Sequence, residues 1–276
     1  MEILFNFAGL SAQPFLIRAF IASGLCAISC AIVGVWVFFF KIPFVALTMA
    51  HAAFAGAVIG IFFGLNPVVS AVVFCLAAAF FIAPLAQKGN FSANASTSII
   101  FSFMLGLAFL FMALIQENRA LALSLMWGSP LTVSVRDIYF IAACAAAVLT
   151  FLVVFNKGII AVIFSRDLAK ASGIAEKPIF YALIILCALS VSVNISGIGG
   201  LLIYSLITIP TATAYQFSQK IKPMYFLSAL FALAACWLGL LASYIFNLPT
   251  GASVVLMACL IFFISLCFAK NNNHYK

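Results

Sequence analysis

Residues Phe44–Leu65 read FVALTMAHAAFAGAVIGIFFGL and contain no Asp, Glu, Lys or Arg. The hydrocarbon core of a bilayer requires roughly 20 apolar residues per helix, so this stretch is long enough to cross a membrane. Similar apolar runs fill most of the remaining chain. They predict helical spans near residues 16–40, 44–64, 67–86, 97–116, 138–156, 179–196, 199–217, 223–246 and 250–269.

The predicted fold is therefore an all-α, polytopic bundle of eight or nine transmembrane helices. Two span counts stay open because the chain could reverse within the membrane around Asn194–Gly200 instead of crossing it. The composition agrees with a membrane protein, since 67% of the residues are hydrophobic and only 7% are charged, against about 25% charged residues in ordinary globular domains.

The polar stretches of the chain are too short to fold by themselves. The longest cover residues 87–98, 156–178 and 270–276, and none could bury a core of its own. We expect a single membrane domain over residues 1–276, so that any ATP-binding or catalytic domain is a separate chain.

The net charge of +8 could indicate a nucleic-acid partner, but the distribution of the charge indicates a lipid bilayer instead. Lys and Arg near helix ends accumulate on the cytoplasmic side. Alternate loops place only Arg18, Arg119 and Arg136 on one side of the membrane. The other side carries Lys41, Lys88, Lys157, Arg166, Lys170, Lys177, Lys220, Lys222, Lys270 and Lys276. This bias predicts an external N-terminus and a cytoplasmic C-terminus.

The sequence offers no pattern for covalent or redox chemistry. P-loop, HExxH, GxSxG and Rossmann patterns are absent, and the five carboxylates lie outside the middle of the predicted spans. The eight cysteines lie within apolar runs and form no CxxC pair, so we interpret them as small apolar residues. We expect no catalytic residue and no permanently bound cofactor.

The second predicted span carries small residues at every fourth position. Ala52, Gly56, Gly60 and Gly64 form one helical stripe, and small residues let two membrane helices approach closely. We therefore expect a tight helix contact along this stripe.

His51 lies one residue before the stripe and is the only histidine in the predicted spans. An ionisable side chain inside a membrane is costly and by default marks a polar cavity, an ion path or a partner. The alternative is that His51 donates one hydrogen bond to a neighbouring helix and has no further role. One imidazole cannot by itself hold a transition metal, which generally takes three or four protein ligands.

The segment Phe164–Gly173 is short, charged and suited to a helix. Ser165 could cap its first turn, Asp167 lies in that turn, and Gly173 suits the C-terminal stop. A helix of this length cannot span the bilayer. It is expected to lie at the cytoplasmic surface, either as a simple linker or as a docking element for another protein.

Pro210 lies inside the predicted span 199–217. Proline removes one backbone hydrogen bond and kinks a helix, and neighbouring threonines can satisfy the freed carbonyls. We expect Thr208, Thr211 and Thr213 to do so. Such a kinked or broken span occurs in substrate paths, and an architectural kink explains it equally well.

Six segments, taken in order along the chain, are similar to those of permeases from the zinc, manganese and iron family of ABC importers. They are PFLIRAF (14–20), AHAAFAGAVIG (50–60), LMWGSPLTVSVRD (125–137), FSRDLAKASGI (164–174), GIGGLLIYSLITIPTATA (197–214) and SYIFNLPTGAS (243–253). The resemblance covers nearly the whole chain.

This resemblance implies a bacterial inner-membrane permease that pairs with a second permease copy. It also implies cytoplasmic ATP-binding subunits and an extracytoplasmic metal-binding protein as partners. His51 matches the histidine of the family's transmembrane path. The ATPase-coupling helix of the family corresponds to the segment containing Ser165, Arg166, Asp167, Leu168, Ala169, Lys170 and Gly173.

The chain departs from the family pattern at three positions. Leu47, four residues before His51, stands where the family usually has an aspartate, and Ser165 and Asn247 replace aspartates that are common there. The missing carboxylate at Leu47 leaves the other ligands of His51 and the identity of the metal open.

The sequence thus predicts the permease subunit of an ABC importer for zinc, manganese or iron, driven by a separate ATPase. One alternative is a transporter of a small molecule or chelated metal that works without an ATPase. Another is an intramembrane enzyme, which would need a second catalytic group facing His51.

Overall fold

The computed structural model describes residues 14–88, 93–115, 128 and 133–268, and all regular structure within them is helical. The helices are α2 (Pro14–Phe39), α3 (Phe44–Phe62), α4 (Pro67–Lys88), α5 (Ala93–Leu114), α7 (Val135–Phe164), α8 (Arg166–Ala171), α9 (Glu176–Ile198), α10 (Gly200–Phe217), α11 (Ile221–Phe246) and α12 (Thr250–Phe268). The predicted all-α class is confirmed, and each predicted span corresponds to one long helix.

Seven of the described helices are long and apolar enough to cross a membrane, namely α2, α3, α5, α7, α9, α11 and α12. In α4 the apolar part is shorter and covers Pro67–Ile82. The eighteen-residue α10 is separated from α9 only by Gly199, whose φ of 92° lies in the left-handed region. The number of crossings, eight or nine, therefore stays a prediction.

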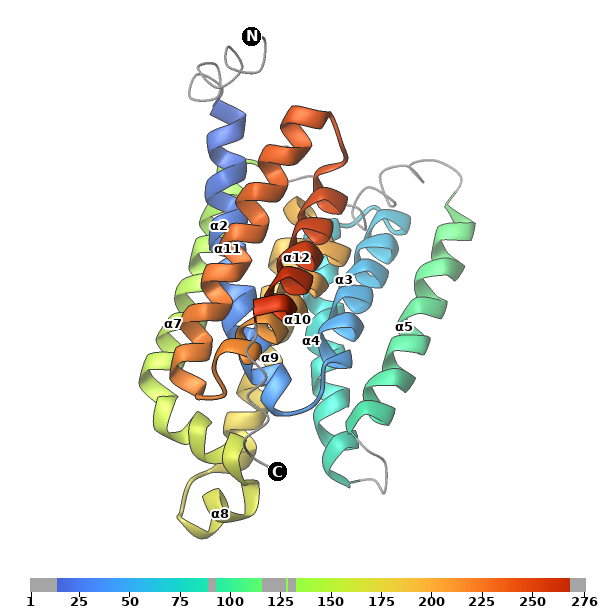
Figure 1. Ribbon diagram of the computed structural model, residues 1–276. Helices are drawn as coiled ribbons and strands as arrows, with labels where there is room; N and C mark the ends of the chain where they lie inside the picture. The colour runs from blue at the N-terminus through green and yellow to red at the C-terminus, as the bar shows by residue number, and fades with distance from the viewer. Residues whose placement is uncertain (1–13, 89–92, 116–127, 129–132, 269–276) are drawn as a thin grey trace.

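The centre of the bundle is formed by α2, α3, α9 and α10 (Figure 1). Most of α2 and α3 is buried, whereas α5 and α7 lie at the two sides of the molecule and expose most of their surface. The short α8 extends from one end of the bundle, opposite to the end at which α2 begins (Figure 1). Helix α8 and the start of α2 therefore lie at opposite ends of the bundle.

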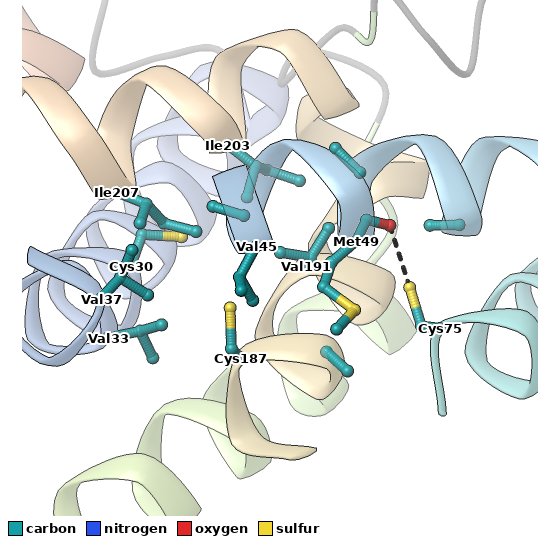
Figure 2. Close-up of a cluster of buried hydrophobic side chains, with 14 of the residues drawn as sticks. Cys30, Val33, Val37, Val45, Met49, Cys75, Cys187, Val191, Ile203 and Ile207 are labelled. Atoms are coloured by element: carbon teal, nitrogen blue, oxygen red, sulfur yellow. Dashed lines mark hydrogen bonds between the residues drawn. The ribbon is translucent and has the colours of Figure 1, made fainter. Parts of the chain in front are cut away.

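The side chains at the centre of the bundle are small, branched or sulfur-containing. Figure 2 shows residues of α2, α3, α4, α9 and α10 converging around Val45 and Met49 of α3. There the Cys75 thiol donates to the Met49 carbonyl at 3.1 Å. All eight cysteines are free, and six are buried as apolar packing residues, whereas Cys259 is half-buried and Cys267 is exposed.

The close helix contact predicted for the small-residue stripe is confirmed at two glycines. A Cβ on Gly56 would lie 2.5 Å from the Ser70 carbonyl oxygen of α4, and one on Gly60 would lie 2.7 Å from Ser70 Oγ. Ala52 is completely buried on the same helix. Only glycine therefore allows α3 and α4 to approach this closely.

Gly64 does not belong to this contact, and its assignment to the stripe is wrong. The helix ends at Phe62, and Gly64 lies in the following turn with a φ of +68° and no atom within 4 Å of an added Cβ. This position requires the conformational freedom of glycine and not its small size, because L side chains rarely adopt a positive φ.

Helix α7 is longer than the sequence predicts. It has 30 residues and begins with a capping box, in which Ser134 and Asp137 bond each other's backbone N–H groups. At 1.5 Å per residue it measures about 45 Å, which exceeds a hydrocarbon core of about 30 Å. Its C-terminal turns contact α9, since Ile159 and Val162 are buried and a Cβ on Gly158 would meet Ile179 Cδ1.

Helix α10 is continuous from Gly200 to Phe217 with Pro210 inside it, so the proline does not break the helix, and a kink at this position stays a prediction. The hydroxyls of Thr208, Thr211 and Thr213 donate to the carbonyls of Tyr204, Ile207 and Ile209. The threonines therefore bond backbone carbonyls around the proline as expected, but not the Leu206 carbonyl, which is the one that an amide at position 210 would have reached.

The contact between α3 and α4 generates the first prediction. Gly56→Ala places a methyl group against the backbone of α4, and overpacking of this kind typically costs about 1–3 kcal/mol. We expect a lower thermal midpoint of the detergent-solubilised protein. The matched control is Gly106→Ala in α5, where an added Cβ meets nothing within 4 Å. Equal midpoints for the two variants would contradict the close contact.

Candidate functional site beside His51 and at helix α8

His51 lies in the second turn of α3, on the side of the helix that faces away from α4. Its Nδ1 lies 3.0 Å from the Leu47 carbonyl oxygen one turn earlier. The imidazole also contacts the edge of Phe101 of α5, with ring centroids 4.8 Å apart at 74°. The hydrogen-bond partner therefore belongs to the same helix, and not to a neighbouring helix as the alternative interpretation assumed.

This hydrogen bond determines the tautomer of His51. A carbonyl oxygen only accepts, so Nδ1 must carry the proton and donate it to Leu47. In a neutral imidazole the other nitrogen, Nε2, then keeps its lone pair. Metal-binding histidines commonly have this arrangement, in which one nitrogen is held by a hydrogen bond and the other faces the ligand.

A cavity of about 90 Å³ lies beside His51. Such a volume can hold several water molecules, since one needs only about 10–15 Å³ by this measure. The cavity is formed by α3, α9 and α10, and its lining consists of Leu47, Ala50, His51, Phe54, Ile195, Gly200 and Tyr204. The lining is mostly apolar, with His51 and Tyr204 supplying the polar side chains.

The protein donors around this cavity are few. Within the described ranges, no three His, Cys, Asp or Glu side chains gather closely enough to hold a metal ion. Leu47 lines the same cavity as His51, so the position one turn before the histidine carries an apolar side chain and no carboxylate. A cation here would be coordinated by imidazole, water and neutral oxygen atoms.

Helix α8 has the local structure predicted for its segment. The Ser165 hydroxyl accepts from the Leu168 amide at 3.3 Å, Asp167 lies in the first turn, and Lys170 lies in the last. Gly173 follows with a φ of +75°. An acidic side chain at the N-terminus and a basic one at the C-terminus both favour the helix dipole. The predicted cap and stop of this helix are therefore confirmed.

The two faces of α8 have different surroundings. Arg166 and Ala169 face the protein, and Ala169 is only 2% exposed, whereas Asp167, Leu168 and Lys170 face outward. The large apolar side chain of Leu168 is 58% exposed. A bulky group at Ala169 would therefore push α8 away from its own chain.

Arg166 attaches α8 to the helical bundle. Its guanidinium lies 3.9 Å from the centre of the Phe180 ring of α9 and 5.5 Å from that of Phe40. Burial lowers the pKa of Arg166, and the negative charge of Glu176 partly offsets this effect. Because an arginine pKa starts above 12, the side chain remains charged. Such cation–π contacts contribute about 0.5–2 kcal/mol each.

Comparison with known proteins defines the family of this chain. The model of the ABC 3 transport family matches residues 12–269, which is nearly the whole chain. The chain belongs to the ABC 3 transport family. This confirms the family resemblance that the six sequence segments indicate.

Several ABC 3 family relatives are similar over almost their full length. The manganese transport system membrane protein MntC of Listeria monocytogenes is 29% identical over 95% of this chain and 93% of its own. The high-affinity zinc uptake system membrane protein ZnuB of Haemophilus influenzae is 29% identical over 84% of this chain and 89% of its own. The solved structure of PsaBC from Streptococcus pneumoniae in complex with Fab superimposes with a TM-score of 0.83.

In the PsaBC comparison the sequence identity is 28%, with 96% of this chain and 95% of the other chain covered. The likeness therefore extends over nearly the whole chain.

Three residues of these sites are not evident from the sequence, namely Tyr204, Phe40 and Phe180. Tyr204 belongs to a run of apolar residues, and its place beside His51 follows from the packing of α10 against α3. The aromatic contacts of Arg166 join residues that are distant in the chain. The amphipathic pattern of α8, with Arg166 three residues before the buried Ala169, is the only signal that could have indicated them.

The tautomer of His51 can be measured because the chain has only two histidines, His51 and His274. In a His274→Gln variant labelled with ¹⁵N-histidine, we expect solid-state NMR to show a protonated Nδ1 and an unprotonated Nε2. Binding of Zn²⁺ should shift the Nε2 resonance more than that of Nδ1. A proton on Nε2 in the metal-free neutral form would contradict the hydrogen bond to Leu47.

Proposed function

We propose that this chain is the membrane-spanning permease subunit of an ABC importer for a divalent transition metal, manganese or zinc. The single observation that carries the proposal is the cavity beside His51, into which an imidazole with a hydrogen-bonded Nδ1 can present Nε2. The family membership and the relatives named for manganese and zinc transport support this cargo. Iron, which the sequence also suggested, stays a prediction.

In this proposal the cavity is a transient transport site. Imidazole is a suitable ligand for transition metals, and conduction requires a site that binds weakly enough to release the ion. Leu47 supplies no charge where an aspartate would, so His51, Tyr204 and water molecules would provide weak coordination. The low number of strong protein ligands thus suits passage of an ion better than storage.

The exposed face of α8 is proposed to dock into a separate ATPase subunit. ATP hydrolysis would take place in that chain, and this permease would catalyse no reaction. Leu168 would supply the apolar contact, flanked by Asp167 and Lys170. An apolar side chain on an exposed and otherwise charged helix is suited to a protein interface, where burial of the apolar group stabilises the complex.

We further propose that a second permease copy and an extracytoplasmic metal-binding protein complete the importer in the bacterial inner membrane. The excess of Lys and Arg on the side of α8 supports a cytoplasmic α8, an external N-terminus and a cytoplasmic C-terminus. In this orientation the N-terminal end of α7 is external, and the 30-residue α7 carries α8 beyond the membrane.

The family match favours this function over a transporter that works without an ATPase. An intramembrane enzyme would need a second catalytic side chain facing His51. Among the described residues around its cavity, Tyr204 is the only other side chain that could exchange a proton.

Metal uptake tests the role of His51. In proteoliposomes holding the permease, its ATPase and its binding protein, His51→Ala should reduce uptake of radioactive manganese or zinc at least about tenfold, the effect of losing roughly 1.4 kcal/mol of ion stabilisation. His274→Ala removes the other histidine and serves as the control. Parental uptake of every metal by His51→Ala would show that this residue is only a packing residue.

A second experiment tests the docking face of α8. Leu168→Asp should abolish stimulation of ATP hydrolysis by the loaded binding protein, because it places a charge where an apolar contact is expected. The matched control is Ala175→Asp, which adds the same side chain at the exposed N-cap of α9, where aspartate is favourable. Full stimulation of hydrolysis by the Leu168→Asp complex would refute docking through this face.

A further inference from the structure

The contact between Arg166 and two aromatic rings connects α8 with the helices that line the His51 cavity. The rings of Phe40 and Phe180 lie 5.4 Å apart in an edge-on arrangement at 78°, and the Arg166 guanidinium lies over both of them. Phe180 is 1% exposed. A charged group from α8 is thus held against a rigid aromatic pair inside the permease.

The two aromatic residues belong to elements that continue to the cavity. Phe40 lies in the turn between α2 and α3, and α3 begins four residues later at Phe44 and carries His51. Phe180 lies near the start of α9, whose residue Ile195 lines the same cavity. Around these rings, Trp36, Val45 and Leu183 pack with little free space.

The turn beneath Arg166 is suited to move as one unit with α3. Lys41 adopts a φ of 56°, and the amide of Ile42 donates to the Val37 carbonyl at 3.1 Å. The amide of Val45 then donates to the Ile42 carbonyl at 3.0 Å. Because these bonds join the end of α2 directly to the start of α3, a displacement of Phe40 would displace α3 as well.

We propose that Arg166 is a positioning residue that transmits movement of α8 to α3 and α9, and so couples ATP hydrolysis to the opening and closing of the His51 cavity. This inference rests on the proposed docking of α8 to an ATPase. Leu168 and its exposed neighbours would receive the movement, and Arg166 on the opposite face would pass it on.

The chemistry of arginine suits this role better than that of lysine. A planar guanidinium can stack on an aromatic face, whereas an ammonium is a compact and strongly hydrated charge. Glu176 in the first turn of α9 adds electrostatic attraction to the same guanidinium. Both contacts pull α8 toward α9, and the buried Ala169 allows the helix to lie close to the bundle.

The test measures metal uptake and ATP hydrolysis together in proteoliposomes holding the complete complex. Arg166→Ala should lower the amount of zinc or manganese taken up per ATP hydrolysed by about tenfold, which is within the range for one desolvated cation–π contact. Binding to the ATPase should stay close to the parental value. Arg166→Lys should lie between the parent and Arg166→Ala.

Two further variants test whether the contact of Arg166 with the Phe180 ring transmits the movement. Phe180→Leu keeps an apolar side chain but removes the π face, and it should lower uptake per ATP in the same way. The double variant Arg166→Ala with Phe180→Leu should lose little more than either single variant, because both remove one shared interaction. Lys177→Ala removes an exposed positive charge from the first turns of α9 and is the control.

Parental uptake per ATP in Arg166→Ala would overturn the proposal, as would fully additive losses in the double variant. Loss of ATPase binding by Arg166→Ala would also overturn it, because the arginine would then act in docking. Failure of the proposed function is distinguishable, since Leu168→Asp would then leave ATPase stimulation unchanged. If Leu168→Asp uncouples the complex and Arg166→Ala does not, only the transmission proposal fails.

Discussion

The close contact of α3 with α4 at Gly56 and Gly60 determines where His51 can lie. Helical residues advance by about 100° each, so Gly56 and Gly60 lie about 140° and 180° around α3 from His51. When the glycines pack against the α4 backbone, the imidazole must face the opposite side, where α10 supplies Tyr204 and Gly200. The packing of one face thus creates the cavity on the other.

The His51 cavity and the end of the permease that carries α8 belong to one continuous structure. Helix α3 begins at the turn whose Phe40 lies under the Arg166 guanidinium, and it carries His51 only seven residues after its first residue, Phe44. Because the interior of a protein is packed as densely as an organic crystal, it transmits displacements instead of absorbing them. The His51 cavity, near this end of α3, is therefore well placed to respond to α8.

Much of the fold is predictable from the sequence, because the membrane requires long apolar helices and permits few alternatives. The caps of α8 at Ser165 and Gly173 follow from local rules in the same way. The length of α7 is not predictable from apolar patterning, since its last turns contain Lys157 and pack against α9, a contact between distant segments. Gly64 is wrongly placed because a four-residue spacing continues past the end of a helix as easily as within it.

The candidate site is likewise only partly predictable from the sequence. His51 is recognisable because an ionisable residue within an apolar span is rare and costly. Tyr204 and the two aromatic partners of Arg166 depend on contacts between distant segments, which no local pattern specifies. The exposure of Leu168 and the burial of Ala169 likewise depend on how α8 lies against the bundle.

The central claim is that a metal ion passes His51 on its way through the membrane. It can be tested directly by pulsed electron paramagnetic resonance of Mn²⁺ bound to the complete complex, with ¹⁵N-labelled histidine in the permease. The account predicts a ¹⁵N coupling of the size expected for a directly coordinated imidazole, present in the parent and lost in His51→Gln. A spectrum of bound Mn²⁺ that His51→Gln leaves unchanged would contradict the account.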